Sequence, residues 1–130
     1  MSPEITHLDF TYKKPGTEVW VLNSDDIPVD KSLIKDQQII RLAPGSFGGN
    51  HKHPRVEWFI GFGELFCVWL DENGTKHEES MNSDTQVKLV KIPPFLPHAI
   101  LNRSASEQAV LFELADDKLT GVEPVLIITP

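Results

Sequence analysis

The sequence has little of several features that would narrow its class. Only one of its 130 residues is a cysteine, Cys67, so no internal disulfide can form. Cys67 lies in an apolar run, where we expect it to be a small buried hydrophobe. Basic residues are also outnumbered, because 12 Lys and Arg face 19 Asp and Glu and leave a formal net charge of −7. That charge argues against a nucleic-acid partner.

Long apolar runs are missing as well. No stretch approaches the roughly 20 residues that a membrane-spanning helix requires. The N-terminus, MSPEITHLDF, carries neither the basic region nor the apolar core of a signal peptide. We therefore expect a cytoplasmic protein without a membrane partner. Its length predicts a single domain over 1–130, with an N-terminal strand arm of about 1–36 and a barrel core of about 37–130.

No long segment shows the 3.6-residue period of an amphipathic helix. Instead, 10 prolines and 8 glycines divide the chain into short segments, several of them rich in β-branched and aromatic residues. The expected strands are 17–22, 37–43, 56–62, 65–70, 75–79, 87–92, 99–101, 110–114 and 125–129. Many short strands with turn signals at close spacing predict an all-β sandwich or barrel.

Three candidate metal ligands follow a glycine-rich loop: His51, His53 and Glu57. All three positions are odd, and side chains of an extended strand alternate between its faces, so we expect them to point to the same side. Two imidazoles and a carboxylate suit Zn, Fe, Mn or Ni better than Ca or Mg. Because an H-x-H pair also occurs by accident, the alternative is a polar strand whose side chains line a solvated loop.

His98 is the third histidine candidate, and it follows prolines at 93, 94 and 97. These prolines favour extended backbone and exclude a central position in a sheet, so we expect a bend at a strand edge. A strand that begins at His98 would place its imidazole at the mouth of the barrel, beside the first histidine segment. Asn102 shares the parity of His98 and could orient a loop or a ligand.

The two segments together resemble the two motifs of the cupin superfamily. The first motif, G-x5-H-x-H-x(3,4)-E-x6-G, is matched by Gly45, His51, His53 and Glu57, with Gly63 one position early. The second motif, G-x5-P-x-G-x2-H-x3-N, is matched by Pro93, His98 and Asn102. Val87 and Phe95 stand where its glycines are usual, which affects the turn because Phe95 cannot freely take a positive φ.

The resemblance implies a small double-stranded β-helix, or jelly roll, that holds one divalent metal ion. Carried over residue by residue, the ligands would be His51, His53, Glu57 and His98. The remaining coordination positions would hold water or substrate, as a catalytic site requires. The ion would be Fe, Mn, Zn or Ni, and the partner a small-molecule substrate or ligand.

A cavity around such an ion would be fairly apolar. The residues that we expect to line it or to bind substrate are Arg41, Phe47, Phe59, Phe95, Ile100 and Asn102. If Arg41 points inward, its guanidinium would suit a carboxylate or phosphate group. For Asn102, we favour a turn hydrogen bond over a ligand contact.

The segment 56–62 predicts an interface. Its inward set would be Glu57, Phe59 and Gly61, which leaves the apolar set of Val56, Trp58, Ile60 and Phe62 on the outer face. An outer face this apolar should not meet water. We expect the N-terminal strand and a second copy of the chain to cover it, and therefore a homodimer through an apolar sheet face.

Three functions fit these features. The similarity to cupins of bacterial sugar and polysaccharide biosynthesis favours a metal-dependent sugar or nucleotide-sugar isomerase or epimerase, whose proton-moving base the sequence does not identify. An iron-dependent dioxygenase would use the same ligands. A non-catalytic metal-containing sensor or small-ligand-binding module is the third alternative, because fold alone does not decide function.

Overall fold

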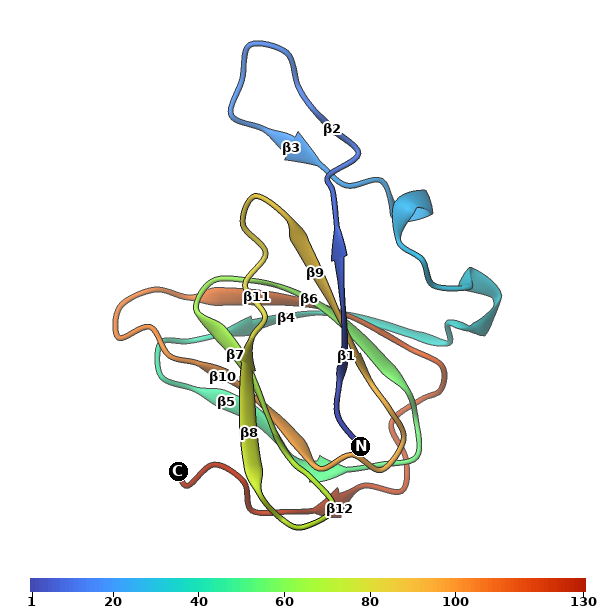
Figure 1. The fold of residues 1–130 in the computed structure, drawn as a ribbon, viewed down its shortest axis with the longest axis vertical. Coiled ribbons are helices and arrows are strands. Elements are labelled where there is room, and N and C mark those ends of the chain that lie inside the picture. Colours follow the sequence, from blue (N-terminus) through green and yellow to red (C-terminus); the bar gives the residue numbers. More distant parts are fainter.

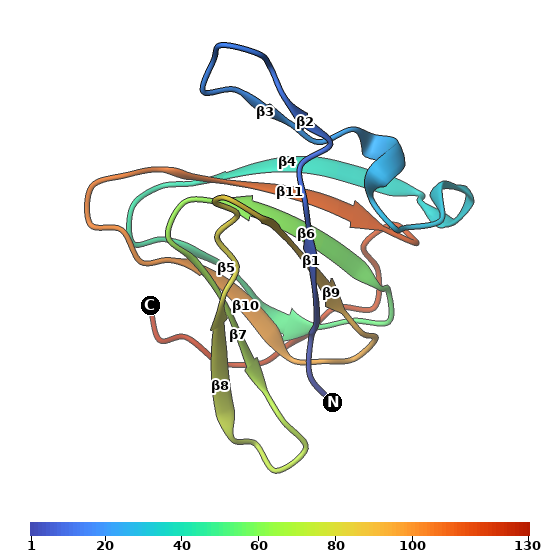
Figure 2. The same ribbon diagram turned by 45° about the horizontal axis from the view of Figure 1, so that its top comes forward.

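The computed structural model describes residues 1–130, and its regular secondary structure is almost entirely antiparallel strands (Figure 1). One five-stranded sheet has the order β1 (Glu4–Leu8), β9 (Val87–Ile92), β6 (Glu57–Phe62), β11 (Ala109–Ala115), β4 (Asp36–Leu42). A second has the order β12 (Glu123–Pro124), β5 (Phe47–Lys52), β10 (His98–Asn102), β7 (Leu65–Leu70), β8 (Lys76–Ser80). Figure 2 shows β4, β11 and β6 above β5, β10 and β7, with the interior of the barrel between them. The prediction of an all-β jelly-roll barrel is confirmed.

The remaining elements belong to the N-terminal segment. β2 (Tyr12–Lys13) pairs with β3 (Trp20–Val21) in a hairpin that projects from the barrel (Figure 1). Two single turns of 3₁₀-helix follow, η1 (Ser24–Asp26) and η2 (Lys31–Leu33). No helix in this structure combines the length and the apolar character needed to cross a membrane. The cytoplasmic location stays a prediction.

Two of the predicted strands are wrong. Over 17–22, only the last residues are paired, because the amide of Lys14 donates to the carbonyl of Val19 and the segment between them is a turn. Over 125–129 there is no ladder, since Pro124 ends β12 and the chain beyond it bonds to a single residue, Asn50, through its backbone carbonyl and its side chain. The β5 strand was expected only as a loop and a histidine segment, and it pairs with β10.

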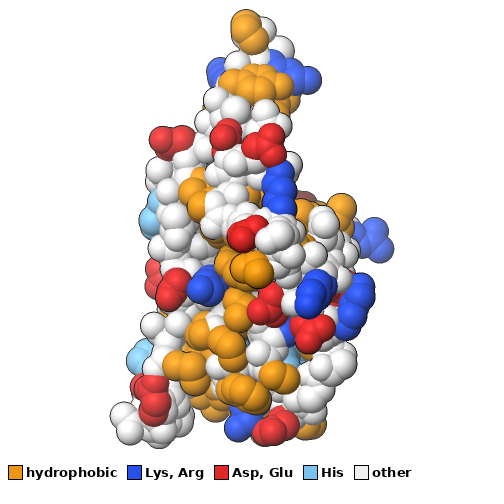
Figure 3. All heavy atoms as spheres, turned by 90° about the vertical axis from the view of Figure 1, so that its right-hand side faces the viewer, with side chains coloured by type: hydrophobic (Ala, Val, Ile, Leu, Met, Phe, Trp, Pro, Cys, Tyr) orange, Lys and Arg blue, Asp and Glu red, His pale blue; other side chains and the backbone are white.

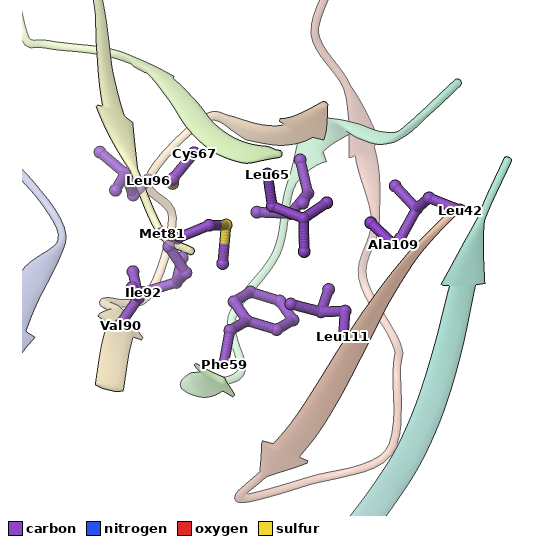
Figure 4. Packing of buried hydrophobic residues seen from close by; sticks show 11 residues of the cluster. Leu42, Phe59, Leu65, Cys67, Met81, Val90, Ile92, Leu96, Ala109 and Leu111 are labelled. Carbon is purple, nitrogen blue, oxygen red and sulfur yellow. The ribbon is translucent and has the colours of Figure 1, made fainter. Parts of the chain in front are cut away.

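The main core lies between the two sheets and joins strands from both (Figure 4). Its buried members are Leu42, Phe59, Leu65, Cys67, Met81, Val90, Ile92, Leu96, Ile100, Ala109 and Leu111. Phe59 faces inward as the alternation of 56–62 predicts, and Cys67 is a fully buried thiol, also as predicted. Burial raises the pKa of Cys67 to about 12, with a further contribution from the charge of Glu79.

A second, smaller cluster covers the outer face of the first sheet. Ile60, Val87 and Leu89 form its buried part, and residues of the N-terminal segment such as Phe10 and Ile27 pack against them. β1 itself extends the sheet by pairing with β9. The predicted cover by the N-terminal segment is therefore present over this part of the face. Figure 3 shows hydrophobic side chains still at the surface, on the projecting hairpin and on the barrel below it.

Candidate metal centre

Three histidine side chains meet inside one end of the barrel. Their ring nitrogens lie within 4.8 Å of one another, and the ring centroids are 4.8 to 5.0 Å apart in edge-to-face pairs. The three are His51, His53 and His98. His53 and His98 are buried, with 1% and 2% of their surface exposed, and His51 is half-buried. Three imidazoles at this spacing can bind one metal ion.

A β-bulge brings two of these rings together. β10 pairs with β5 so that His98 lies opposite His51 and Ala99 opposite Gly49, which leaves Asn50 as an extra residue with a φ of 56°. A Cβ on Gly49 would lie 2.8 Å from the carbonyl oxygen of His98, so only glycine permits the strands to approach this closely. The bulge therefore turns His51 toward the imidazole of His98.

The other ligand candidates are placed by a turn. β5 ends at Lys52 and β6 begins at Glu57, with His53 and Pro54 between them. The prediction that these ligands share one face of a single strand is therefore wrong. They converge because the chain reverses between the two strands, where Pro54 has no amide to continue a ladder.

The contacts of His98 indicate which of its ring nitrogens carries the proton. Nδ1 of His98 lies 2.7 Å from the carbonyl oxygen of Leu96, which can only accept a hydrogen bond. In the neutral ring, Nδ1 carries the proton and Nε2 keeps its lone pair. A backbone carbonyl that fixes the tautomer in this way is a common partner of metal-binding histidines.

Glu57 completes the group. Its Oε1 lies 3.1 Å from Nε2 of His53 and 3.2 Å from Nε2 of His98. Oε1 of Glu57 and both ring nitrogens of His53 are buried without a hydrogen-bond partner. Each buried polar atom without a partner destabilises the folded state by about 1–3 kcal/mol, unless a proton or a cation lies between it and its neighbour. Two donor atoms bound to one ion at about 2.1 Å are separated by about 3.0–3.4 Å, so the cluster fits a divalent metal.

Electrostatics also favour a ligand set that is ready for a cation. Burial lowers the pKa of His51 to about 4, with further contributions from His98 and His53, so its ring is neutral at pH 7. Burial opposes ionisation of Glu57, but the close approach of the His53 and His98 ring nitrogens outweighs it and holds the pKa of this carboxyl well below its usual range. Neutral imidazoles and an ionised carboxylate are the forms that bind metal.

A cavity of about 310 Å³ opens beside the cluster. His51, Glu57 and His98 reach it, while His53 is not among its lining residues. The cavity lies at the lower end of the size range of small-molecule sites, and apolar walls with a few convergent polar groups are typical of them.

Comparison with known proteins identifies the fold. No family model matches the chain, and no characterised protein matches it in sequence. Three solved structures resemble it closely in shape. The TDP-fucose-3,4-ketoisomerase WlaRA of Campylobacter jejuni has a TM-score of 0.66 at 19% identity, over 92% of this chain and 85% of WlaRA. The 3,4-ketoisomerase QdtA of Thermoanaerobacterium thermosaccharolyticum, as a mutant in complex with TDP-4-keto-6-deoxyglucose, has a TM-score of 0.63 at 19% identity, over 90% of this chain and 83% of QdtA.

The third is the capsular polysaccharide assembling protein CapF of Staphylococcus aureus, with a TM-score of 0.62 at 18% identity. The match covers 70% of this chain but only 27% of CapF. The chain has the cupin fold. Within this fold the histidine cluster lies between the two sheets, where the cavity meets it.

The cupin barrel positions the predicted cavity residues in different ways. Phe59 and Ile100 form part of the apolar wall of the cavity, and Arg41 and Phe47 also border it. On β4, however, the core-facing positions are Ile40 and Leu42, so strand alternation directs the side chain of Arg41 to the opposite face, at the exposed edge of the sheet. The side chain of Arg41 makes no hydrogen bond or ion pair with the rest of the chain.

Phe95 and Asn102 lie outside the cavity lining. Phe95 is half-exposed in the turn before β10, where it takes a φ of 63° although it is not glycine, and its amide donates to the carbonyl of His53. Asn102 is fully buried, and its side-chain amide donates to the carbonyls of Leu42, Ala43 and Glu107. Asn102 thus has the turn-bonding position that was the alternative to a ligand contact.

Sequence reasoning missed two charged cavity residues, Arg55 and Glu113. Arg55 is buried and binds Oε2 of Glu57, while Glu113 lies on β11 and accepts a hydrogen bond from Arg55. Burial raises the pKa of Glu113 to about 8, and the neighbouring carboxylate of Glu57 adds to the shift. Strand alternation could have indicated that Glu113 faces inward, because Glu113 shares its parity with the core residue Leu111.

Proposed function

We propose that this chain is a metal-dependent isomerase that acts on a sugar or nucleotide-sugar. The observation that carries the proposal is the convergence of His51, His53, His98 and Glu57 beside a cavity, in a fold shared with two sugar 3,4-ketoisomerases. The identities of 19% support the fold alone. The assignment of the reaction therefore depends on the chemistry of the cavity and on the experiments below.

The four side chains would hold one Fe, Mn, Zn or Ni ion. Support comes from the donor set and from the buried unpartnered atoms of His53 and Glu57, which a cation would satisfy. When bound, such an ion supplies a Lewis acid that polarises a carbonyl oxygen. Calcium and magnesium fit less well, because they prefer oxygen ligands.

The rest of the cavity would position the substrate. Phe59 and Ile100 give it an apolar wall, which excludes water from the reacting carbon atoms. A sugar fits into the cavity, so a nucleotide attached to it would extend past the rim.

Glu113 is the candidate for moving the proton. To shift a carbonyl to the adjacent hydroxyl-bearing carbon, one proton must leave that carbon and another must be added to the former carbonyl carbon, while the hydroxyl proton passes from one oxygen to the other, with no net oxidation. Glu113 lines the cavity and is the carboxyl there that is not part of the proposed ligand set. Its side chain is held in place by a hydrogen bond of 2.8 Å from Nη2 of Arg55 to Oε1 of Glu113.

The proposal is tested with TDP-4-keto-6-deoxyglucose in deuterated buffer, followed by NMR. We expect the carbonyl to move to the neighbouring carbon and solvent deuterium to appear beside it. Glu113→Gln should lower kcat by about 10²–10⁴-fold with the metal retained. Glu79→Gln, on the exposed strand β8, should change neither kcat nor KM.

Other results would support the alternatives. Oxygen uptake by the iron-loaded protein on a metabolite panel, with no isomerisation, would favour a dioxygenase. Ligand binding without turnover by any metal form would favour a binding or sensor module. Either result would overturn the isomerase.

We also propose that the chain forms a homodimer through the apolar face of the first sheet. Ile39 on β4 is 78% exposed, and Phe62 and Val110 on neighbouring strands are 44% and 41% exposed. Val110 lies directly opposite Phe62, so these two apolar side chains are neighbours on the outer face. Sedimentation should report a dimer that Ile39→Asp dissociates. A monomer at micromolar concentration would contradict the interface.

A further inference from the structure

Arg55 lies in the turn between β5 and β6, two residues before Glu57, and its side chain is only 3% exposed. Each nitrogen of its guanidinium has a partner. Nε donates to Oε2 of Glu57 at 2.8 Å, and Nη2 lies 2.7 Å from the same oxygen and 2.8 Å from Oε1 of Glu113. Nη1 donates to Oδ2 of Asp36 at 2.9 Å and to the carbonyl of Asp117 at 3.2 Å.

This arrangement gives the two carboxylate oxygens of Glu57 different neighbours. Arg55 occupies Oε2 with two of its nitrogens, and Oε1 is left facing His53 and His98 without a hydrogen-bond partner. A carboxylate that is free to rotate could instead offer both oxygens to one cation. The contact with Arg55 opposes that rotation.

We propose that Arg55 is a positioning residue that holds Glu57 as a ligand through one oxygen and thereby sets the affinity of the cluster for divalent ions. The inference rests on the metal centre described under the proposed function, but not on the reaction assigned to it. It also concerns selectivity, because calcium favours carboxylates that can bind through both oxygens, whereas zinc accepts a single oxygen beside imidazoles.

The other contacts of Arg55 explain why this position is rigid. Asp36 begins β4, Glu113 lies on β11, and Asp117 follows that strand. The guanidinium is thus tied to the first sheet and not only to the turn that carries it. Charge-assisted hydrogen bonds of this type are stronger than hydrogen bonds between neutral groups. Glu57 therefore takes its orientation from the sheet.

Lysine could not take over this role. A guanidinium presents five N–H groups in a fixed planar fork, whereas an ammonium has three on a flexible stem. Arg55→Lys keeps the positive charge but cannot reach Oε2 of Glu57 and the groups of the sheet together. This variant separates the geometry of the side chain from its charge.

The experiment measures zinc affinity by competition with a chromophoric chelator. We expect Arg55→Lys to weaken zinc binding by about 10–100-fold, as is typical for a residue that orients a metal ligand. The matched control is Arg103→Lys, since Arg103 also binds a carboxylate with both nitrogens of its fork, that of Glu78, but at the surface of the second sheet. The control should bind zinc as the unmodified chain does.

A double-mutant cycle shows whether Arg55 acts through Glu57. In a Glu57→Gln background, adding Arg55→Lys should cause no further loss of zinc affinity. An equal loss in both backgrounds, or no loss at all from Arg55→Lys, would overturn the inference. If the unmodified chain binds no ion, the metal centre fails and this inference with it, whereas the absence of isomerase activity leaves the cycle unaffected.

A second measurement uses the unmodified chain and covers the case in which Arg55→Lys does not fold. Infrared difference spectra between zinc-loaded and metal-free protein report how a carboxylate binds. We expect the wide separation of the two carboxylate stretching bands that marks binding through one oxygen. The narrow separation of a chelating carboxylate would overturn the proposed role of Arg55.

Discussion

His53 allows the metal centre to be tested through stability. The side chain is 1% exposed, and neither ring nitrogen has a hydrogen-bond partner. In the absence of metal, this burial should cost about 1–3 kcal/mol for a buried polar group without a partner. Leucine has a similar size and no polar atoms, so His53→Leu should stabilise the metal-free protein by about that amount.

The expected shift in melting temperature follows from the length of the chain. At about 2.1 cal/mol/K per residue, unfolding of 130 residues changes the entropy by about 0.27 kcal/mol/K. Each kcal/mol therefore moves the Tm by about 3.7 °C, and His53→Leu should raise it by about 4–11 °C without metal. With zinc at 100 times its Kd, the unmodified protein should gain about 2.7 kcal/mol, or about 10 °C, and the variant almost nothing.

Differential scanning calorimetry with and without chelator measures both effects. The matched control is His7→Leu, because His7 is exposed on β1 and makes no side-chain hydrogen bond. The control should shift the Tm little and keep the response to zinc. A clear drop in the Tm of metal-free His53→Leu would refute the reasoning, since it would mean that the imidazole stabilises the barrel by itself.

Other predictions concern the turns and the core. Phe95→Gly should leave stability unchanged or raise it by up to about 1 kcal/mol in urea titrations, whereas Phe95→Val should lower it, because a φ of 63° disfavours β-branched residues; equal stability of the two variants would contradict this. Asn102→Ala should cost about 2–4 kcal/mol in the same assay, since three backbone carbonyls, one of them in a fully buried bond, lose their donor, while the exposed Asn73→Ala should cost under about 0.5 kcal/mol. Burial, with the nearby charge of Glu79, raises the pKa of Cys67 to about 12, so the thiol stays protonated at pH 8 and should react with a thiol reagent only after unfolding; rapid reaction of the native protein would be the contrary result.

The fold was largely predictable because its strands are apolar and bounded by turn signals. The segments 65–70 and 87–92 are strands with the predicted bounds. The segment 17–22 has equally high β-propensity, yet a turn closed by Lys14 and Val19 takes most of it. Propensity alone could not reveal that contact, because tertiary and turn hydrogen bonds override it.

The site was predictable in its residue types but not in its construction. The motif spacing indicated His51, His53, Glu57 and His98, and the structure brings them together. Strand alternation could not give the reversal of the chain after Lys52 or the bulge at Asn50, since both break the period of two.

Two cavity groups illustrate the same limit. Arg55 occupies a polar turn of the sequence, where a solvated side chain is the usual expectation, and only its partners from distant segments show that it is buried. Glu113 could have been found from its parity with Leu111.

The most direct test of the central claim is the metal content of the protein purified without chelator and without added metal. We predict close to one Fe, Mn, Zn or Ni ion per chain by elemental analysis. His51→Ala and His98→Ala should abolish this content and leave the β-sheet circular dichroism unchanged. No metal in the unmodified protein, even after reconstitution, or full metal content in both variants, would contradict the metal centre.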